Sequence, residues 1–273
     1  MNPIATLIAE HALRWHVPGQ PLIVGVCGTQ ASGKSTACAQ VVAQLTAQGL
    51  NAGVLGLDDL YLGRSARVGL AADIHPLYIT RGPPGTHDTE LGIQTLDAVK
   101  RGEGVSLPRF DKRADEPLER DRWPLLAQQC DLLLFEGWCV GARPQEESEL
   151  GHPVNALEAV GDPDLVWRRA VNAQLAGPTG DLFARLDRLV YLQPPSFEIV
   201  HNWRCQQERD YLASDPPEGA PAAMSDEQVA LFVAHYERLT RHCLAEMPGR
   251  ADLTIALDAD RGVISSSARP IFS

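Results

Sequence analysis

The sequence predicts an α/β fold in which helices cover both faces of a mostly parallel, five-stranded sheet. Three observations indicate this doubly wound arrangement: short apolar runs end in turn residues, segments with helical spacing separate them, and no internal repeat is found. Continuous apolar runs are typical of parallel strands that are buried on both faces. Their alternation with helices favours one doubly wound domain over residues 1–273.

Five apolar runs are the expected strands. They cover residues 21–28, 52–58, 131–137, 188–193 and 251–258. A further run at 105–110 contains Pro108, which has no backbone N–H to donate, so we expect an edge strand there at most.

Helices are expected in the segments between these strands. They cover residues 1–15, 33–48, 88–102, 165–176, 180–186, 195–212 and 225–247. Gly49 is a stop signal after the second helix, and Ser225 and Gln228 have the spacing of a capping box at the start of the last one. The stretches 62–87, 139–164 and 214–223 are rich in glycine, proline or polar residues, and we expect them to be irregular.

Composition and charge exclude several classes of protein. The 273 residues are 44% hydrophobic and carry a net charge of −11, so a large core is expected and a nucleic-acid backbone or an anionic membrane surface is a poor partner. The first residues lack a basic region and include Glu10, and no apolar run is long enough to span a membrane. The six cysteines have no C-x-x-C spacing, which predicts reduced thiols in a cytoplasmic protein.

The stretch GVCGTQASGKST, residues 25–36, contains the pattern G-x-x-x-x-G-K-[ST] between an expected strand and an expected helix. Glycines allow such a loop to wrap a phosphate with backbone N–H groups, and the following helix directs its positive end at the anion. Lys34 would reach the β- and γ-phosphates, and the Ser35 hydroxyl would hold Mg²⁺. The pattern predicts a P-loop NTPase that binds ATP on Gly28, Thr29, Gln30, Ala31, Ser32, Gly33, Lys34, Ser35 and Thr36.

Acidic residues follow two other expected strands at the edge where ligands bind in open α/β sheets. Glu136 ends the run DLLLFEG and is the candidate second metal ligand. Asp58 and Asp59 end the second strand, and one of them is the candidate base for an acceptor hydroxyl. Adjacent side chains on a strand point to opposite faces, so the other aspartate is expected to cap or support; strand parity alone leaves open which is which.

Motifs along nearly the whole chain, from about residue 20 to 260, resemble those of the D-glycerate 3-kinase family. These are P-loop small-molecule kinases related to uridine kinase, phosphoribulokinase and bacterial pantothenate kinase. The P-loop and LFEG are shared by the whole superfamily, whereas LDDLYL, GTHD, LPRFDK, EGW and WRCQQE point to the glycerate branch. Two positions differ from the usual motif sequences of the family. Leu60 stands where phenylalanine is usual, and Phe110 stands where tyrosine is usual.

The resemblance implies a catalytic set. Asp58 matches the base of the superfamily, and Lys34 belongs to the P-loop. The helix 195–212 matches a lid, which would extend over about 195–224, and Arg204 is the candidate that closes over the transferring phosphate. Arg209 lies five residues away and therefore on another face of the helix, so we expect it to be structural.

The resemblance also implies substrate-side segments at about 60–87 and 107–124 and an inserted segment at about 139–186. Cations in the second of these segments are candidates to bind a carboxylate, and Lys112 is notable because the chain has only three lysines. The expected substrate contacts are Asp59, Tyr61, His87, Asp88, Arg109, Asp111, Lys112, Arg120, Arg122 and Trp138.

The sequence therefore predicts an ATP- and Mg²⁺-dependent kinase whose small-molecule acceptor is a carboxylate-bearing polyol such as D-glycerate. The acceptor depends on the resemblance; composition and spacing stop at a small-molecule kinase. A nucleoside or pantothenate as acceptor, an ATP-hydrolysing switch protein, and a module that binds nucleotide without turnover remain as alternatives. The intact set of P-loop, metal-side acid and candidate base argues against the last of these.

Overall fold

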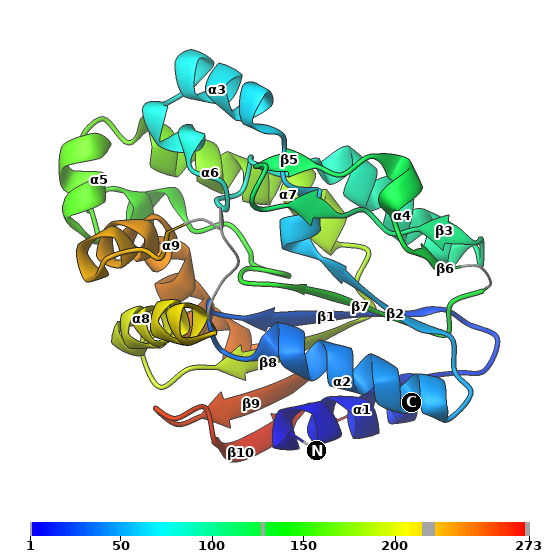
Figure 1. The fold of residues 1–273 in the computed structure, drawn as a ribbon. Helices are drawn as coiled ribbons and strands as arrows, with labels where there is room; N and C mark the ends of the chain where they lie inside the picture. Colours follow the sequence, from blue (N-terminus) through cyan, green and yellow to red (C-terminus); the bar gives the residue numbers. More distant parts are fainter. Residues whose placement is uncertain (1, 127–128, 215–221, 271–273) are drawn as a thin grey trace.

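The computed structural model describes residues 2–126, 129–214 and 222–270 (Figure 1). A six-stranded sheet in the order β10-β9-β8-β1-β7-β2 forms its centre. The strands are β1 Leu22–Gly28, β2 Ala52–Gly56, β7 Leu132–Gly137, β8 Arg188–Gln193, β9 Leu253–Leu257 and β10 Val263–Ala268. All neighbouring pairs are parallel except β9 and β10. The predicted α/β class and the five parallel strands are confirmed.

The sixth strand, β10, was not predicted. Its sequence VISSSA is antiparallel to β9 at the edge of the sheet, and residues 264–268 are exposed. An exposed edge strand needs neither a continuous apolar run nor an alternation of apolar and polar residues. Its sequence therefore lacks the hydrophobic pattern from which strands are predicted.

Helices cover the two faces of the sheet. On one face α1 Pro3–Trp15 and α2 Lys34–Ala47 pack against side chains such as Val24 and Leu134. On the other face lie α4 Thr89–Lys100, α6 Val166–Ala176, α7 Pro178–Phe183 and α9 Asp226–Glu246, which bury Leu133 and Phe135. The helix α8 Glu198–Ala213 packs against α9 on the side toward which the parallel strands point (Figure 1).

The connecting segments contain more structure than the sequence predicts. Within 62–87 the structure has α3 Arg64–Asp73 and the 3₁₀ helix η2 Pro76–Ile79, so the prediction of an irregular stretch was wrong there. The only buried residue of α3 is Arg67, and a helix without an apolar stripe gives no periodic signal. Within 139–164 there are η4 Glu147–Leu150 and α5 Ala156–Gly161.

The expected edge strand at 105–110 is divided in two. The structure has β3 Val105–Ser106, paired with β6 Leu125–Leu126, and β4 Phe110–Asp111, paired with β5 Glu116–Pro117. The 3₁₀ helices η1 Leu57–Leu60, η3 Arg120–Arg122 and η5 Met247–Gly249 complete the described elements. The capping box at Ser225 and Gln228 is confirmed, whereas the predicted connector 214–223 lies mostly outside the described residues.

The six cysteines are buried and unpaired, as predicted. Among the described helices we find none with the length and apolarity needed to cross a membrane.

A buried group of charged side chains fastens α5 and α6 to α9. The guanidinium of Arg168 lies 3.0 Å from Asp162 and 3.6 Å from Glu158, and all three side chains are 1–2% exposed. Arg238 of α9 donates to both carboxylate oxygens of Glu158, at 2.8 and 2.7 Å. This cluster fixes the position of α9, whose other side faces the site described below.

We expect Arg168→Met to destabilise the fold by about 3–5 kcal/mol, because it would leave two buried carboxylates short of a cationic partner. Equilibrium unfolding in urea measures the change. The matched control is Arg169→Met, since Arg169 is 54% exposed and pairs with an exposed glutamate, so its loss should cost less than about 1 kcal/mol. Equal effects of the two substitutions would contradict the structural role of the cluster.

Candidate active site

The P-loop connects the carboxyl end of β1 to the amino end of α2. Gly33 has a φ of 86°, a conformation that glycine adopts without strain. At Gly28 a Cβ atom would lie 2.9 Å from the Ser32 hydroxyl and 3.1 Å from the Leu192 side chain. The two glycines of the motif are therefore needed for different reasons, one for backbone conformation and one for close packing.

Many polar groups of this loop have no partner among the described residues. The side-chain oxygens of Thr29, Gln30 and Ser32 are buried without a hydrogen bond. No acceptor in the described ranges receives the backbone N–H groups of Gln30, Ala31, Gly33, Lys34, Ser35 and Thr36. Convergent N–H groups at a helix N-terminus bind anions, so the loop is built to receive a phosphate chain.

Glu136 lies beside the P-loop because β7 pairs with β1 in a register that sets Glu136 against Val26. The Ser35 hydroxyl donates to the Glu136 carboxylate at 2.7 Å, and the Lys34 ammonium is 3.8 Å from it. A hydroxyl and a carboxylate oxygen in contact suit Mg²⁺, which takes few protein ligands and keeps phosphate and water oxygens. No group of three or more metal-ligating side chains occurs in the described ranges.

Asp58 and Asp59 point in different directions because they lie in η1, directly after β2. Asp59 accepts from the backbone N–H groups of Gly56 and Phe110, at 3.2 and 3.3 Å, and so supports the turn. Burial raises its pKa. Asp58 instead accepts from the Tyr61 hydroxyl at 2.6 Å and from the Lys112 ammonium at 2.5 Å.

The partners of Asp58 decide its charge. Burial alone would raise its pKa, but the charge and hydrogen bond of Lys112 and the hydrogen bond of Tyr61 outweigh burial and lower the pKa to about 2. Asp58 is therefore ionised throughout the neutral range and is able to accept hydrogen bonds.

Asp58 and the P-loop share a cavity of about 630 Å³. It is lined by Gln30, Ala31, Gly33, Lys34, Ser35, Thr36, Asp58, Tyr61, Arg67, Ile79, Thr80, Arg81, Lys112, Asp115, Arg204, Gln207, Met224, Phe232 and Tyr236. Parts of the chain that are far apart in the sequence therefore meet at this cavity. They are the carboxyl ends of β1 and β2, the segment 79–81, the loop 112–115, and helices α8 and α9.

Arg204 reaches the cavity from α8, whereas Arg209 does not line it. The Arg204 guanidinium pairs with Glu208, hydrogen-bonds Gln207 at 2.8 Å, and lies 5.7 Å from the centre of the Phe232 ring. Arg209 hydrogen-bonds Gln206 on the surface of the same helix.

Several residues expected to contact a substrate lie behind the cavity wall. His87 is buried and stacks on Tyr61 with ring centres 4.9 Å apart, and burial lowers its pKa to about 4, so it is neutral. Asp88 caps α4 through the N–H of Leu91. Trp138 donates to the Gly82 carbonyl at 3.0 Å and packs edge-on against Tyr236. In this structure these side chains support the cavity.

Other expected contacts are also outside the cavity. Arg109 bonds to the Val54 and Pro108 carbonyls and pairs with Asp59. The Asp111 carboxylate accepts from backbone N–H groups in its own turn, while Arg120 and Arg122 are exposed. Sequence reasoning missed the cavity residues Arg67, Arg81, Asp115, Phe232 and Tyr236. The first three lie on segments with no apolar periodicity, and the two aromatic residues read as ordinary helix core.

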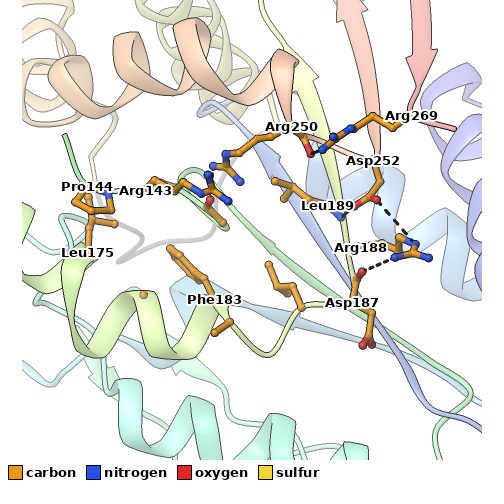
Figure 2. Close-up of a pocket in the computed structure, with 15 residues that line it drawn as sticks. Arg143, Pro144, Leu175, Phe183, Asp187, Arg188, Leu189, Arg250, Asp252 and Arg269 are labelled. Atoms are coloured by element: carbon orange, nitrogen blue, oxygen red, sulfur yellow. Dashed lines mark hydrogen bonds and ion pairs between the residues drawn. The ribbon is translucent and has the colours of Figure 1, made fainter. Parts of the chain in front are cut away.

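A second cavity, of about 410 Å³, lies where β8 and β9 begin, at the opposite end of the strands from the P-loop (Figure 2). Most of its arginines are held by the protein itself. Arg250 binds Glu246 and the Gly141 carbonyl, Arg269 binds the Arg250 carbonyl, and Arg188 lies 3.9 Å from Asp252. We assign no chemistry to this cavity.

Comparisons with known proteins agree with the fold. No protein-family model matches the chain. An uncharacterized kinase of Schizosaccharomyces pombe, mug58, is 33% identical over 231 residues, which cover 80% of this chain and 79% of that protein. The chloroplastic D-glycerate 3-kinase of Arabidopsis thaliana is 28% identical over 264 residues, or 89% of this chain and 54% of the plant protein, so this chain spans about half of that relative. A solved D-glycerate 3-kinase structure from Cryptococcus neoformans matches with a TM-score of 0.77 and 24% identity, covering 98% of this chain and 100% of that one.

The fold and the site define a P-loop kinase, a phosphotransferase that uses ATP and acts on an alcohol group of a small molecule. Uridine kinase-like protein 3 of Arabidopsis thaliana, 24% identical over 198 residues, which cover 72% of this chain and 40% of that protein, is a more distant relative. The chain belongs to the same kinase family as mug58, and the D-glycerate 3-kinases are further relatives of it.

We expect Lys112→Met to raise the pKa of Asp58 from about 2 toward or above its ordinary value. The substitution removes the main influence that favours the ionised carboxylate and leaves the effect of burial less opposed. A ¹³C NMR titration of the Asp58 carboxyl between pH 2 and 6 measures the change. Lys100→Met is the control, because Lys100 pairs with Asp187 elsewhere. An unchanged titration in the Lys112 variant would contradict the ion pair.

Proposed function

We propose that this protein transfers the γ-phosphate of ATP to D-glycerate and releases ADP and 3-phosphoglycerate. The observation that carries the proposal is the shared cavity, in which the Asp58 carboxylate faces the same space as Lys34 and Ser35. A kinase must hold an acceptor hydroxyl in line with the γ-phosphate and offer a group for its proton. The D-glycerate 3-kinases among the relatives support the choice of acceptor.

The P-loop would bind the phosphates through its unpaired N–H groups, with Lys34 neutralising charge on the β- and γ-phosphates. Ser35 and Glu136 would hold Mg²⁺, which would supply positive charge at the phosphate oxygens. Their contact at 2.7 Å supports this proposal, because two oxygen ligands of one ion must lie close together.

Asp58 would orient the acceptor hydroxyl and take its proton. A low pKa suits this role, because phosphoryl transfer passes through a loose transition state in which positioning and charge stabilisation matter more than a strong base. Tyr61 and Lys112 would keep the carboxylate ionised and oriented. Arg204, on α8, would move onto the transferring phosphate and stabilise its developing charge.

Of the remaining predicted substrate residues, Tyr61 lines the cavity. Asp59, His87, Asp88 and Trp138 would act from behind the cavity wall, by fixing the segments that carry Tyr61 and its neighbours. Direct contacts of Arg109, Asp111, Arg120 and Arg122 with a substrate stay predictions.

The proposal is tested by ADP release from purified protein and Mg·ATP with D-glycerate, L-glycerate, pantothenate, uridine and ribulose 5-phosphate. We expect turnover with D-glycerate to exceed that with each other acceptor by at least about tenfold, since a site with buried polar groups rejects acceptors that leave them unpaired. The product is identified by ³¹P NMR. Preference for uridine or pantothenate would overturn the choice of acceptor, and ATP hydrolysis unaffected by every acceptor would favour the switch protein.

Asp58→Asn is expected to lower kcat by roughly 10²–10⁴-fold, the usual contribution of a general base, because the amide is isosteric but cannot take the proton. The affinity for an ATP analogue should change less than about threefold, since Asp58 is outside the P-loop. Steady-state kinetics and calorimetric titration measure the two quantities. An equal loss of turnover and of nucleotide affinity would contradict the assignment of Asp58 as base.

A further inference from the structure

The acceptor side of the cavity contains a guanidinium group with an unused edge, on Arg81. Of the cations that line the cavity, Lys34 belongs to the P-loop and Arg204 pairs with Glu208 on α8. The cations on the acceptor side are Arg67, Arg81 and Lys112, and their hydrogen bonds distinguish their roles.

Each of the three guanidinium nitrogens of Arg67 donates a hydrogen bond inside the protein. Its side chain is 3% exposed, and it donates from Nε to the Leu62 carbonyl at 3.2 Å, from Nη1 to the Ile79 carbonyl at 2.7 Å, and from Nη2 to the Asp115 carboxylate. The burial of Arg67 leaves little of its guanidinium accessible to a ligand, and its charge fixes Asp115 in place.

Asp115 connects Arg67 to Arg81. Its other carboxylate oxygen accepts from Nη1 of Arg81 at 2.5 Å. Burial would raise the pKa of Asp115, but the hydrogen bonds and charges of the two arginines outweigh it and lower the pKa, so the carboxylate is ionised. Asp115 also has a φ of 60°, a conformation that costs free energy for a non-glycine residue and often occurs at functional sites.

Arg81 is held at three further points. Its carbonyl accepts from the Tyr236 hydroxyl at 2.9 Å, and its guanidinium lies 5.8 Å from the centre of the Phe110 ring. Its Nη1 also donates to the Lys112 carbonyl at 3.4 Å, which sets it beside the residue that pairs with Asp58. The guanidinium therefore has a fixed place next to the candidate base.

The Nε and Nη2 groups of Arg81 donate to no acceptor in the described ranges, and the side chain is 32% exposed in the cavity wall. These two N–H groups are parallel, and together they match the two oxygens of a carboxylate. Arg67, Arg81 and Asp115 together carry one net positive charge, because one carboxylate is shared between two guanidinium groups. Asp58 offsets the charge of Lys112, and Arg81 is the exposed arginine of the group, so it presents the remaining positive charge on this side.

We propose that Arg81 binds the carboxylate of the acceptor through its Nε–Nη2 edge and thereby selects hydroxy acids over uncharged alcohols. Asp115 and Arg67 are positioning residues that hold Arg81 in this orientation. The inference deepens the proposed function and rests on it for the position of the acceptor hydroxyl. It differs from the sequence-based expectation that the carboxylate of the acceptor is bound by Arg109, Lys112, Arg120 and Arg122.

The test compares D-glycerate with glycerol, which has the same carbon chain but no carboxylate. Arg81→Gln should raise the KM for D-glycerate by about 10- to 100-fold, the expected loss of charge-assisted hydrogen bonds. The KM for ATP and the kcat/KM for glycerol should stay within about twofold. Arg81→Lys should recover part of the preference, because it keeps the charge but not the paired donors.

Asp115→Asn is expected to lower the preference for glycerate over glycerol without an equal loss for glycerol, since the amide would release Arg81 from its orientation. The matched control is Arg64→Gln, an exposed arginine of α3 that does not line the cavity. It should leave both substrates unaffected.

The outcomes separate this inference from the proposed function. An unchanged KM for D-glycerate in Arg81→Gln, or equal losses for glycerate, glycerol and ATP, would overturn the inference while leaving the kinase assignment intact. Wild-type activity with another carboxylate acceptor, such as pantothenate, that falls in Arg81→Gln would support the inference and overturn D-glycerate as substrate. Wild-type preference for an uncharged acceptor would overturn both.

Discussion

The site depends on the burial of β1 in the middle of a parallel sheet. Every residue of β1 is buried, and its neighbours β7 and β8 run in the same direction. Parallel strands end at one edge of a sheet, so the residues that follow them meet there whatever their distance along the chain. The P-loop and Asp58 come from two different strands and reach one cavity for this reason. Glu136, at the end of a third strand, contacts the P-loop through the Ser35 hydroxyl. Moving any of these residues to the other end of its strand would separate it from the rest.

Charge is divided between the two sides of the cavity in different ways. On the nucleotide side, most backbone N–H groups of the P-loop lack partners among the described acceptors, and Lys34 has only its contact with Glu136 at 3.8 Å. On the acceptor side, the carboxylates Asp58 and Asp115 are each shared between two donors. A polyphosphate carries several negative charges and needs a strongly positive binding site, whereas a small acceptor carries one negative charge at most. The carboxylates around Asp58 are paired with cations, and the Nε–Nη2 edge of Arg81 remains available. This arrangement suits the smaller ligand.

Sequence patterns and resemblance identified cavity residues that follow a strand or belong to a motif, and they missed others that lie on loops. The five parallel strands were confirmed, and Lys34, Ser35, Asp58 and Arg204 were predicted from local patterns and resemblance and do line one cavity. Arg81 and Asp115 were not found, because the positive φ of Asp115 and the shared carboxylate arise only when segments far apart in the chain meet. The side-chain orientations of Arg109, Arg120 and Arg122 were not predictable either, because the position of a basic residue near a motif does not show which way its side chain points.

The core, and not α8, holds the acceptor side in shape. Tyr236 of α9 and Trp138 after β7 donate to the adjacent carbonyls of Arg81 and Gly82, and their rings pack edge-on at 4.7 Å. At Gly82, with a φ of 128°, a Cβ atom would lie 2.1 Å from the Tyr236 hydroxyl, so only glycine fits there. Because α9 is itself fastened through Arg238 to the buried charge cluster, the backbone of Arg81 is fixed before any ligand arrives. Binding then need not order this segment, which is how a single guanidinium on a loop provides selectivity.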